Sequence, residues 1–270
     1  MNGKIFRRKK NPMIFQPRDR LILDKVFQYR FLDPEQVAGL CGFGSRKRAN
    51  DRLRKMFDAG HLSRRLLADN FGRKVLCFPG PKAAEILASA SGRDPSEIRK
   101  KRTKILKVRD SFLNHYILIN YFHYSLEIAL KCWPLAAIEE WQYKKVLFMS
   151  DDRRLYPDAY MRFRHDGEVR NCFLEVDRSI ESRQRIRKKI EFYLDYNLSG
   201  DFENRFGFKH FRLLIVCKTM ERLKSLSKII EKVTDKSFCW LTVSRNVSPS
   251  RILNRIWRRS NKEGEYSLIE

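Results

Sequence analysis

The chain has 270 residues and a formal net charge of +25 at pH 7, because 57 Lys and Arg stand against 32 Asp and Glu. Hydrophobic residues make up 43% of the sequence, which is enough to build packed cores and excludes an intrinsically disordered chain. No apolar run approaches the roughly 20 residues of a membrane-spanning helix, and no secretory signal follows the charged N-terminus, so we expect a cytoplasmic protein without a membrane partner.

The positive charge is concentrated toward the N-terminus. Residues 1–110 contain 28 Lys and Arg against 11 Asp and Glu, whereas residues 111–270 contain 29 against 21. A surplus of this size predicts a polyanionic partner, and nucleic acid is the leading candidate. A ribosome-associated or merely soluble basic protein is the alternative.

Residues 1–15 form a basic arm, and residues 16–91 carry the pattern of a winged helix-turn-helix. Three helical segments come first, and each has a start signal, with Pro at the first helical position or a capping Asp or Ser. These signals are Pro17, Asp33-Pro34 and Ser45. Gly60 ends the third helix, and two strand-like runs joined by Asp69-Asn-Phe-Gly72 then predict a β-hairpin.

The third helix is strongly basic, and double-stranded DNA is therefore the expected partner of this domain. In a winged helix the first turns of this helix enter the major groove, while the hairpin meets flanking phosphates. Arg and Asn bind guanine and adenine edges in bidentate fashion, so the candidates for base contact are Arg46, Arg48 and Asn50. The candidates for phosphate contact are Lys47, Arg52, Arg64, Arg65, Arg73 and Lys74.

A second domain is expected at residues 105–245, after a polar linker at 92–104 and before a basic C-terminal tail at 246–270. A long apolar helical pattern from Val108 to Lys131 opens the domain. Several strand-like runs, a charged helix and a buried strand follow it. This order predicts an α/β domain with a mixed central sheet, in a chain that is α+β overall.

Two carboxylates are placed as in a metal-dependent phosphodiesterase. Asp158 follows Pro157 at a strand-like run, and Glu175 lies in the next run, Phe-Leu-Glu-Val-Asp (173–177), beyond a turn at Asp166-Gly167. Mg²⁺ takes oxygen ligands of this kind, and Glu127 and Glu140 are further candidates. In the alternative interpretation, Asp158 caps a turn and Asp177 pairs with a nearby cation, for which the candidates are Arg178, Arg183 and Arg187.

The chain also resembles the plasmid replication-relaxation protein family, whose members occur on mobile elements and whose second domain is similar to the PD-(D/E)xK nuclease fold. The residues that carry the resemblance are 16–23, 30–37, 52–62, Tyr-Pro-Asp-Ala-Tyr (156–160), 173–178 and Lys-Ile-Glu-Phe-Tyr (189–193). The resemblance implies a restriction-endonuclease-like domain in which Asp158, Glu175 and the carbonyl of Val176 bind Mg²⁺. The catalytic Lys of that fold would stand at position 177, which is Asp here, and Lys189 is the candidate replacement.

Three functions remain open at this point. The first is a DNA-binding protein of a mobile element, acting in replication control or transcription, whose nuclease-like domain is inactive. The second is a Mg²⁺-dependent DNA endonuclease or nickase that uses Asp158, Glu175 and Lys189. The third is a protein–protein adaptor in a replication or transfer complex, either as a homodimer or with other replication proteins.

Overall fold

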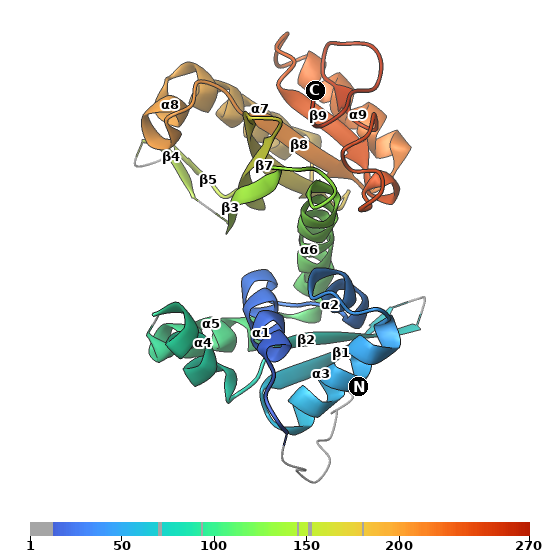
Figure 1. Cartoon of the computed structure of the whole chain (residues 1–270). Helices are drawn as coiled ribbons and strands as arrows, with labels where there is room; N and C mark the ends of the chain where they lie inside the picture. The colour runs from blue at the N-terminus through green and yellow to red at the C-terminus, as the bar shows by residue number, and fades with distance from the viewer. Residues whose placement is uncertain (1–12, 70–71, 93, 145, 151–152, 180) are drawn as a thin grey trace. The chain divides into compact units, whose positions relative to one another are not determined.

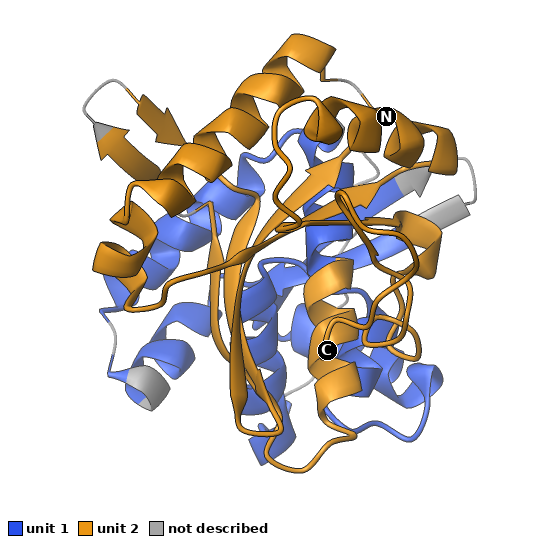
Figure 2. Ribbon diagram, turned by 90° about the horizontal axis from the view of Figure 1, so that it is seen from above, with its two compact units in different colours: residues 1–120 blue, residues 121–270 orange. Residues whose placement is uncertain are grey.

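The computed structural model describes residues 13–69, 72–92, 94–144, 146–150, 153–179 and 181–270. The chain divides into two compact units, residues 1–120 and 121–270, which are coloured separately in Figure 2. The division falls inside helix α6 (Asp110–Leu130). In the described part of the chain, no helix is both long enough and apolar enough to cross a bilayer.

The first unit has three helices followed by an antiparallel hairpin (Figure 1). The helices are α1 (Pro17–Tyr29), α2 (Pro34–Leu40) and α3 (Arg46–Asp58), and the hairpin strands are β1 (Leu62–Asp69) and β2 (Gly72–Pro79). The caps are those that the sequence predicts, because Asp33 accepts a hydrogen bond from the Gln36 N–H at 2.9 Å and Ser45 accepts one from the Arg48 N–H at 3.3 Å. Gly60 follows α3 with a φ of +89°, a conformation that favours glycine.

A buried ion pair joins the first and third helices of this unit. Asp19 of α1 is fully buried, and Arg52 of α3 donates to both of its carboxylate oxygens, with Nε 2.6 Å from Oδ1. The Gln16 N–H donates to Asp19 Oδ2 at 2.7 Å, so the carboxylate also closes a capping box at the start of α1. On the same two helices, Ile22, Val26 and Leu53 are fully buried.

The expected linker is mostly helical. Helix α4 (Ala83–Ser91) is followed at once by α5 (Pro95–Leu106), which Asp94 caps by accepting from the Ser96 N–H at 2.8 Å. Ile98 and Ile105 are seven residues apart, so they lie on one side of α5, and both are buried. Two apolar residues at helical spacing are thus enough to fold a segment that otherwise looks polar, and the segment expected as a linker has helical structure.

The second unit is built on a six-stranded mixed sheet with the strand order β10-β9-β8-β7-β6-β3. The strands are β3 (Ala137–Tyr143), β6 (Ala159–His165), β7 (Glu168–Asp177), β8 (Arg212–Cys217), β9 (Cys239–Val243) and β10 (Arg258–Arg259). Strands β3, β6 and β7 are antiparallel neighbours, whereas β7, β8 and β9 are parallel. The predicted α/β fold with a mixed central sheet is confirmed.

Helices occupy both connections between the parallel strands. Helix α7 (Arg183–Leu198) and the short α8 (Asp201–Phe206) link β7 to β8, and α9 (Met220–Glu231) links β8 to β9. Their apolar side chains form one core with a single face of the sheet, in which Phe173, Tyr193 and Phe202 are fully buried. On the opposite face, Phe122 of α6 contacts Trp141 and Trp257, with ring centroids 6.4 and 6.2 Å apart.

Two segments of this unit differ from the sequence prediction. One of the strand-like runs, which we expect at residues 155–164, is split, because β5 (Arg153–Leu155) pairs with β4 (Leu147–Ser150) in a separate hairpin and β6 begins only at Ala159. The expected tail at 246–270 is packed onto the domain. Trp257 is fully buried and donates from Nε1 to the Ile252 carbonyl at 3.0 Å. Burial of apolar side chains therefore fixes this segment to the domain, although its basic residues suggest an unattached tail.

The ion pair between Asp19 and Arg52 makes a testable contribution to stability. Replacing Arg52 with Ala leaves the Asp19 carboxylate buried without its cation, and we expect a loss of about 3 kcal/mol in the unfolding free energy of the first unit. Lys55→Ala, at an exposed position on the same helix, should change it by less than about 0.5 kcal/mol. Urea denaturation followed by circular dichroism measures both, and equal effects would rule out a structural role for the pair.

Candidate functional site

Asp158 and Glu175 project from the same face of the sheet. Ala159, the first residue of β6, pairs with Leu174 of β7. Asp158 comes directly before Ala159, and Glu175 comes directly after Leu174, so the two acids are neighbours across the strands. Side chains alternate between faces along a strand, which places Glu175 with Phe173 on the face covered by α7. Asp158 also bonds across the strands, because the Val176 N–H donates to its Oδ2 at 2.8 Å.

Helix α7 supplies two groups that hold the Glu175 carboxylate. The Lys189 ammonium donates to Oε2 at 2.8 Å, and the Tyr193 hydroxyl donates to Oε1 at 2.7 Å. Lys189 and Tyr193 are four residues apart, so a single face of the helix presents both. Glu181 also contacts the ammonium, with its Oε2 3.3 Å from Lys189 Nζ. The structure therefore brings the three predicted site residues together.

Burial sets the protonation states of this cluster. It raises the pKa of Glu175 to about 7, against the opposing charge of Lys189, and the nearby Asp158 adds to the rise. Burial alone would lower the pKa of Lys189, but the Glu175 and Glu181 carboxylates raise it above its usual value, so the amine stays charged. Burial and the neighbouring Glu175 raise the pKa of Tyr193, which keeps its phenol protonated as a donor.

Three carboxylates lie near a single ammonium in this cluster, those of Asp158, Glu175 and Glu181. In the described residues, no group of three or more His, Cys, Asp or Glu side chains is placed so that it could hold a metal ion by itself. Mg²⁺ can bind without such a group, since it retains several waters and binds through one or two carboxylates together with substrate phosphates.

Asp177, two residues after Glu175 on β7, has a partner that comes from α9. Arg222 donates to both oxygens of Asp177, at 2.7 and 3.0 Å, and also to the Glu181 carbonyl at 3.1 Å. The prediction that Asp177 pairs with Arg178, Arg183 or Arg187 was wrong. Pairing with Arg222 was not visible in the sequence because 45 residues separate the two.

The additional carboxylates lie in other pairs. Glu140 is 3.6 Å from Arg162, its neighbour on β6, and Glu127 is 3.7 Å from Lys131 one turn along α6. Tyr193, Glu181 and Arg222 were missed as members of the site. Only Tyr193 had a detectable signal, because it lies four residues after Lys189 within a predicted helix.

The residues predicted to contact DNA fall into two groups in the structure. The exposed group comprises Arg46, Lys47, Arg48 and Asn50, which lie in the first turns of α3. The members of the second group are bonded within the protein. Arg52 pairs with the buried Asp19, Arg65 pairs with Asp110, and Lys74 Nζ lies 2.8 Å from Asp33 Oδ2.

Arg64 is also committed to internal contacts. Its guanidinium lies over the Phe57 ring, 5.5 Å from the centroid, and donates to the Asn50 carbonyl at 3.4 Å. The side chain of Arg73, like the basic arm up to residue 12, lies outside the described part of the structure. The buried Asp19 partner gives Arg52 a structural role, and its contact with phosphate stays a prediction.

Comparison with known proteins decides the family. A model of the family described as Replication-relaxation matches residues 23–210, which is more than half of the chain. The chain belongs to the replication-relaxation family. The matched region of this replication-relaxation protein begins within α1 and includes α2, α3, the hairpin and the cluster around Glu175. The resemblance inferred from its sequence motifs is confirmed.

Other comparisons add little to the family assignment. A search of curated proteins gives no match to this replication-relaxation protein. Among solved structures, the restriction endonuclease FokI is similar, with 11% sequence identity and a TM-score of 0.33. The match covers 85% of this chain and 43% of the FokI chain. A TM-score this low carries no argument about function.

The charge balance around Glu175 can be measured directly. Lys189 lowers the pKa of Glu175, so replacing Lys189 with Met should raise that pKa from about 7 by about one to three pH units. Titration of ¹³C-labelled glutamate carboxyls by NMR follows the change, and Glu175→Gln identifies the signal. Lys188→Met, at the exposed neighbouring position, should leave the titration unchanged. An unchanged midpoint in the Lys189 variant would show that the two groups do not interact in solution.

Proposed function

We propose that this replication-relaxation protein is a DNA-binding protein with a Mg²⁺-dependent phosphodiesterase site at Asp158, Glu175 and Lys189, and that it cleaves or nicks DNA. One observation carries the proposal: the Lys189 ammonium lies 2.8 Å from Glu175, on the strand face that also presents Asp158. A cation beside two carboxylates is the combination that the nuclease fold obtains from its usual motif. Helix α7 supplies here the amine that position 177 lacks.

Each residue has a distinct part in this proposal. Asp158 and Glu175 would hold the cation, and Mg²⁺ bound there would supply a lowered pKa for its coordinated water and a positive charge beside the scissile phosphate. Lys189 would donate to a phosphate oxygen and stabilise the negative charge that develops in the transition state. Tyr193 keeps the Glu175 carboxylate oriented by donating to its second oxygen.

The first unit would bind the DNA. Three helices and a hairpin in this order support a winged helix, and the exposed cations in the first turns of α3 support its insertion in the major groove. The family assignment and the overall charge of +25 point in the same direction. Arg46, Arg48 and Asn50 remain the residues proposed to read base edges.

A second function has an observation of its own. The Glu175 carboxylate already accepts two hydrogen bonds and is only 7% exposed, which is compatible with a fold that keeps DNA binding without cleavage. In that case the cluster would stabilise the domain, and the protein would control replication or transcription through binding alone. An adaptor that joins proteins in a replication complex has no comparable support from the geometry.

Cleavage separates the first two functions. Supercoiled plasmid incubated with the full chain and Mg²⁺ or Mn²⁺ should be nicked or linearised, and EDTA should stop the reaction. Asp158→Ala, Glu175→Gln and Lys189→Ala should each slow it by about 100-fold or more, because each removes a metal ligand or the stabilising cation. Lys188→Ala, beside Lys189 and exposed, is the matched control and should retain activity. Cleavage that persists in all three site variants would place the active site elsewhere.

Base recognition by α3 is tested by its sequence preference. A preferred duplex is first selected from random sequences. Arg46→Ala or Asn50→Ala should weaken binding to that duplex by about 1–3 kcal/mol and relax the preference at one position. Lys55→Ala, exposed on the last turn of α3, should leave the preference intact. If both variants bind selected and unrelated duplexes as the wild type does, α3 does not read DNA.

A further inference from the structure

A groove of about 680 Å³ lies between α7 and α9 in the second unit, and its lining is strongly basic. Five cations line it, with Glu221 as the acid among the lining residues. They are Arg183, Arg187, Lys224, Lys228 and Lys232. This imbalance has no part in the core or in the candidate site, so it calls for an anionic partner.

The cations form two rows at helical spacing. Arg183 and Arg187 are four residues apart on α7, and the three lysines follow at intervals of four on α9 and its C-cap. Residues four apart lie on one side of a helix, about 6 Å apart along its axis. Both helices pack on the same sheet face, so each wall of the groove carries its own row.

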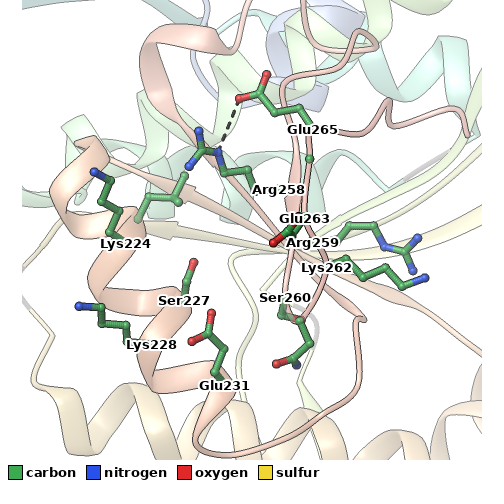
Figure 3. A pocket seen from close by; sticks show the side chains of 13 residues that line it. Lys224, Ser227, Lys228, Glu231, Arg258, Arg259, Ser260, Lys262, Glu263 and Glu265 are labelled. Atoms are coloured by element: carbon green, nitrogen blue, oxygen red, sulfur yellow. Dashed lines mark ion pairs between the residues drawn. The ribbon is translucent and has the colours of Figure 1, made fainter.

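The lysine row is exposed and makes no ion pair with any described residue. Arg187 pairs with Glu191 at 2.8 Å, but both groups are solvated, and such a surface pair contributes little energy that a ligand would have to overcome. A second cavity, of about 780 Å³, lies on the other side of α9 and is drawn in Figure 3.

That second cavity shares Lys224 and Lys228 with the groove but carries more acid. Its lining includes Glu231, Glu263 and Glu265, and the last of these lies 3.6 Å from Arg258. In Figure 3, Lys224 and Lys228 extend from α9 away from the loop that carries Arg258 and Glu265. The excess of positive over negative side chains is therefore larger on the α7 side of the helix.

We infer that the α7–α9 groove is a binding site for the phosphate backbone of duplex DNA, separate from the three helices of the first unit. The inference rests on the proposed function in taking DNA as the partner. One end of the groove lies near the candidate site, because Arg222, next to Glu221, bonds to Asp177 and Asp177 follows Glu175 by two residues. The groove therefore begins close to the end of β7, the strand that carries Glu175.

The lining argues for a duplex backbone over other polyanions. It has no aromatic side chain, and proteins that hold single strands use aromatic platforms for base stacking. The large apolar side chains that are exposed in the described residues all lie outside the groove, whereas a helix that binds a membrane surface inserts such side chains between lipids. Lysines bind phosphate without reading sequence.

The test compares two variants of equal net charge in the full chain. The first combines Lys224→Gln, Lys228→Gln and Lys232→Gln; the second combines Lys209→Gln, Lys236→Gln and Arg251→Gln, at exposed positions outside both cavities. Fluorescence anisotropy with 30-bp duplexes of two unrelated sequences is measured in EDTA across a range of salt concentrations. EDTA prevents cleavage, so binding is scored independently of the metal site.

The affinity for DNA falls as salt rises, so the slope of log affinity against log salt is negative. We expect this slope to be less steep by about three in the groove variant, or by about one per lysine. Its affinity at 0.1 M salt should be roughly 100-fold below that of the control variant, for both sequences alike. Equal slopes in the two variants would mean that only net charge matters, and would overturn the inference. A groove variant that loses binding to phosphatidylserine vesicles but keeps its DNA affinity would assign the groove to lipid and overturn it as well.

Failure of this inference is distinct from failure of the proposed function. Suppose that the wild type binds and cleaves DNA and that the groove variant binds DNA as tightly as the control. The inference about the groove is then wrong, whereas the proposed function stands. If the wild type binds no duplex at any salt concentration, both fail. Thermal unfolding of both variants, expected to match the wild type because all six positions are exposed, confirms that the comparison is between folded proteins.

Discussion

The contact between Glu175 and Lys189 is the constraint on which the second unit depends. A carboxylate that is 7% exposed needs a partner, because burying an unpaired charge is costly. The partner comes from α7, so the helix has to pack with the face that carries Lys189 and Tyr193 against β7. That packing also fixes the row of cations on the outer side of the same helix. One buried ion pair thus determines which side chains of α7 meet β7 and which ones line the groove.

In the first unit, acids decide which of the many cations are available to a partner. Asp19, Asp33 and Asp110 each engage one basic side chain of α3 or the hairpin. The cations of the first turns of α3 have no such neighbour among the described residues, and they stay exposed. A net charge of +25 therefore exaggerates the number of contacts that this protein has ready for a polyanion. Position relative to the few carboxylates matters more than abundance.

Much of the fold was predictable because its signals are local. Capping by Asp33 and Ser45, the stop at Gly60 and the alternating runs of the sheet all lie within a few residues of the features that they specify. The carboxylates at 158 and 175 and the amine at 189 were predicted as a group. Their supporting contacts were not, because the partner of Asp177 lies 45 residues away and the fate of the C-terminal segment depends on a buried Trp257. Contacts of that kind depend on tertiary packing, which neither composition nor periodicity encodes.

The bidentate contact between Asp177 and Arg222 has a consequence for how this chain can change. A Lys at position 177 would set two like charges against each other where β7 ends, and would release α9 from the strand. A substitution at either position therefore has to be matched by a substitution at the other, so the two residues can change only as a pair.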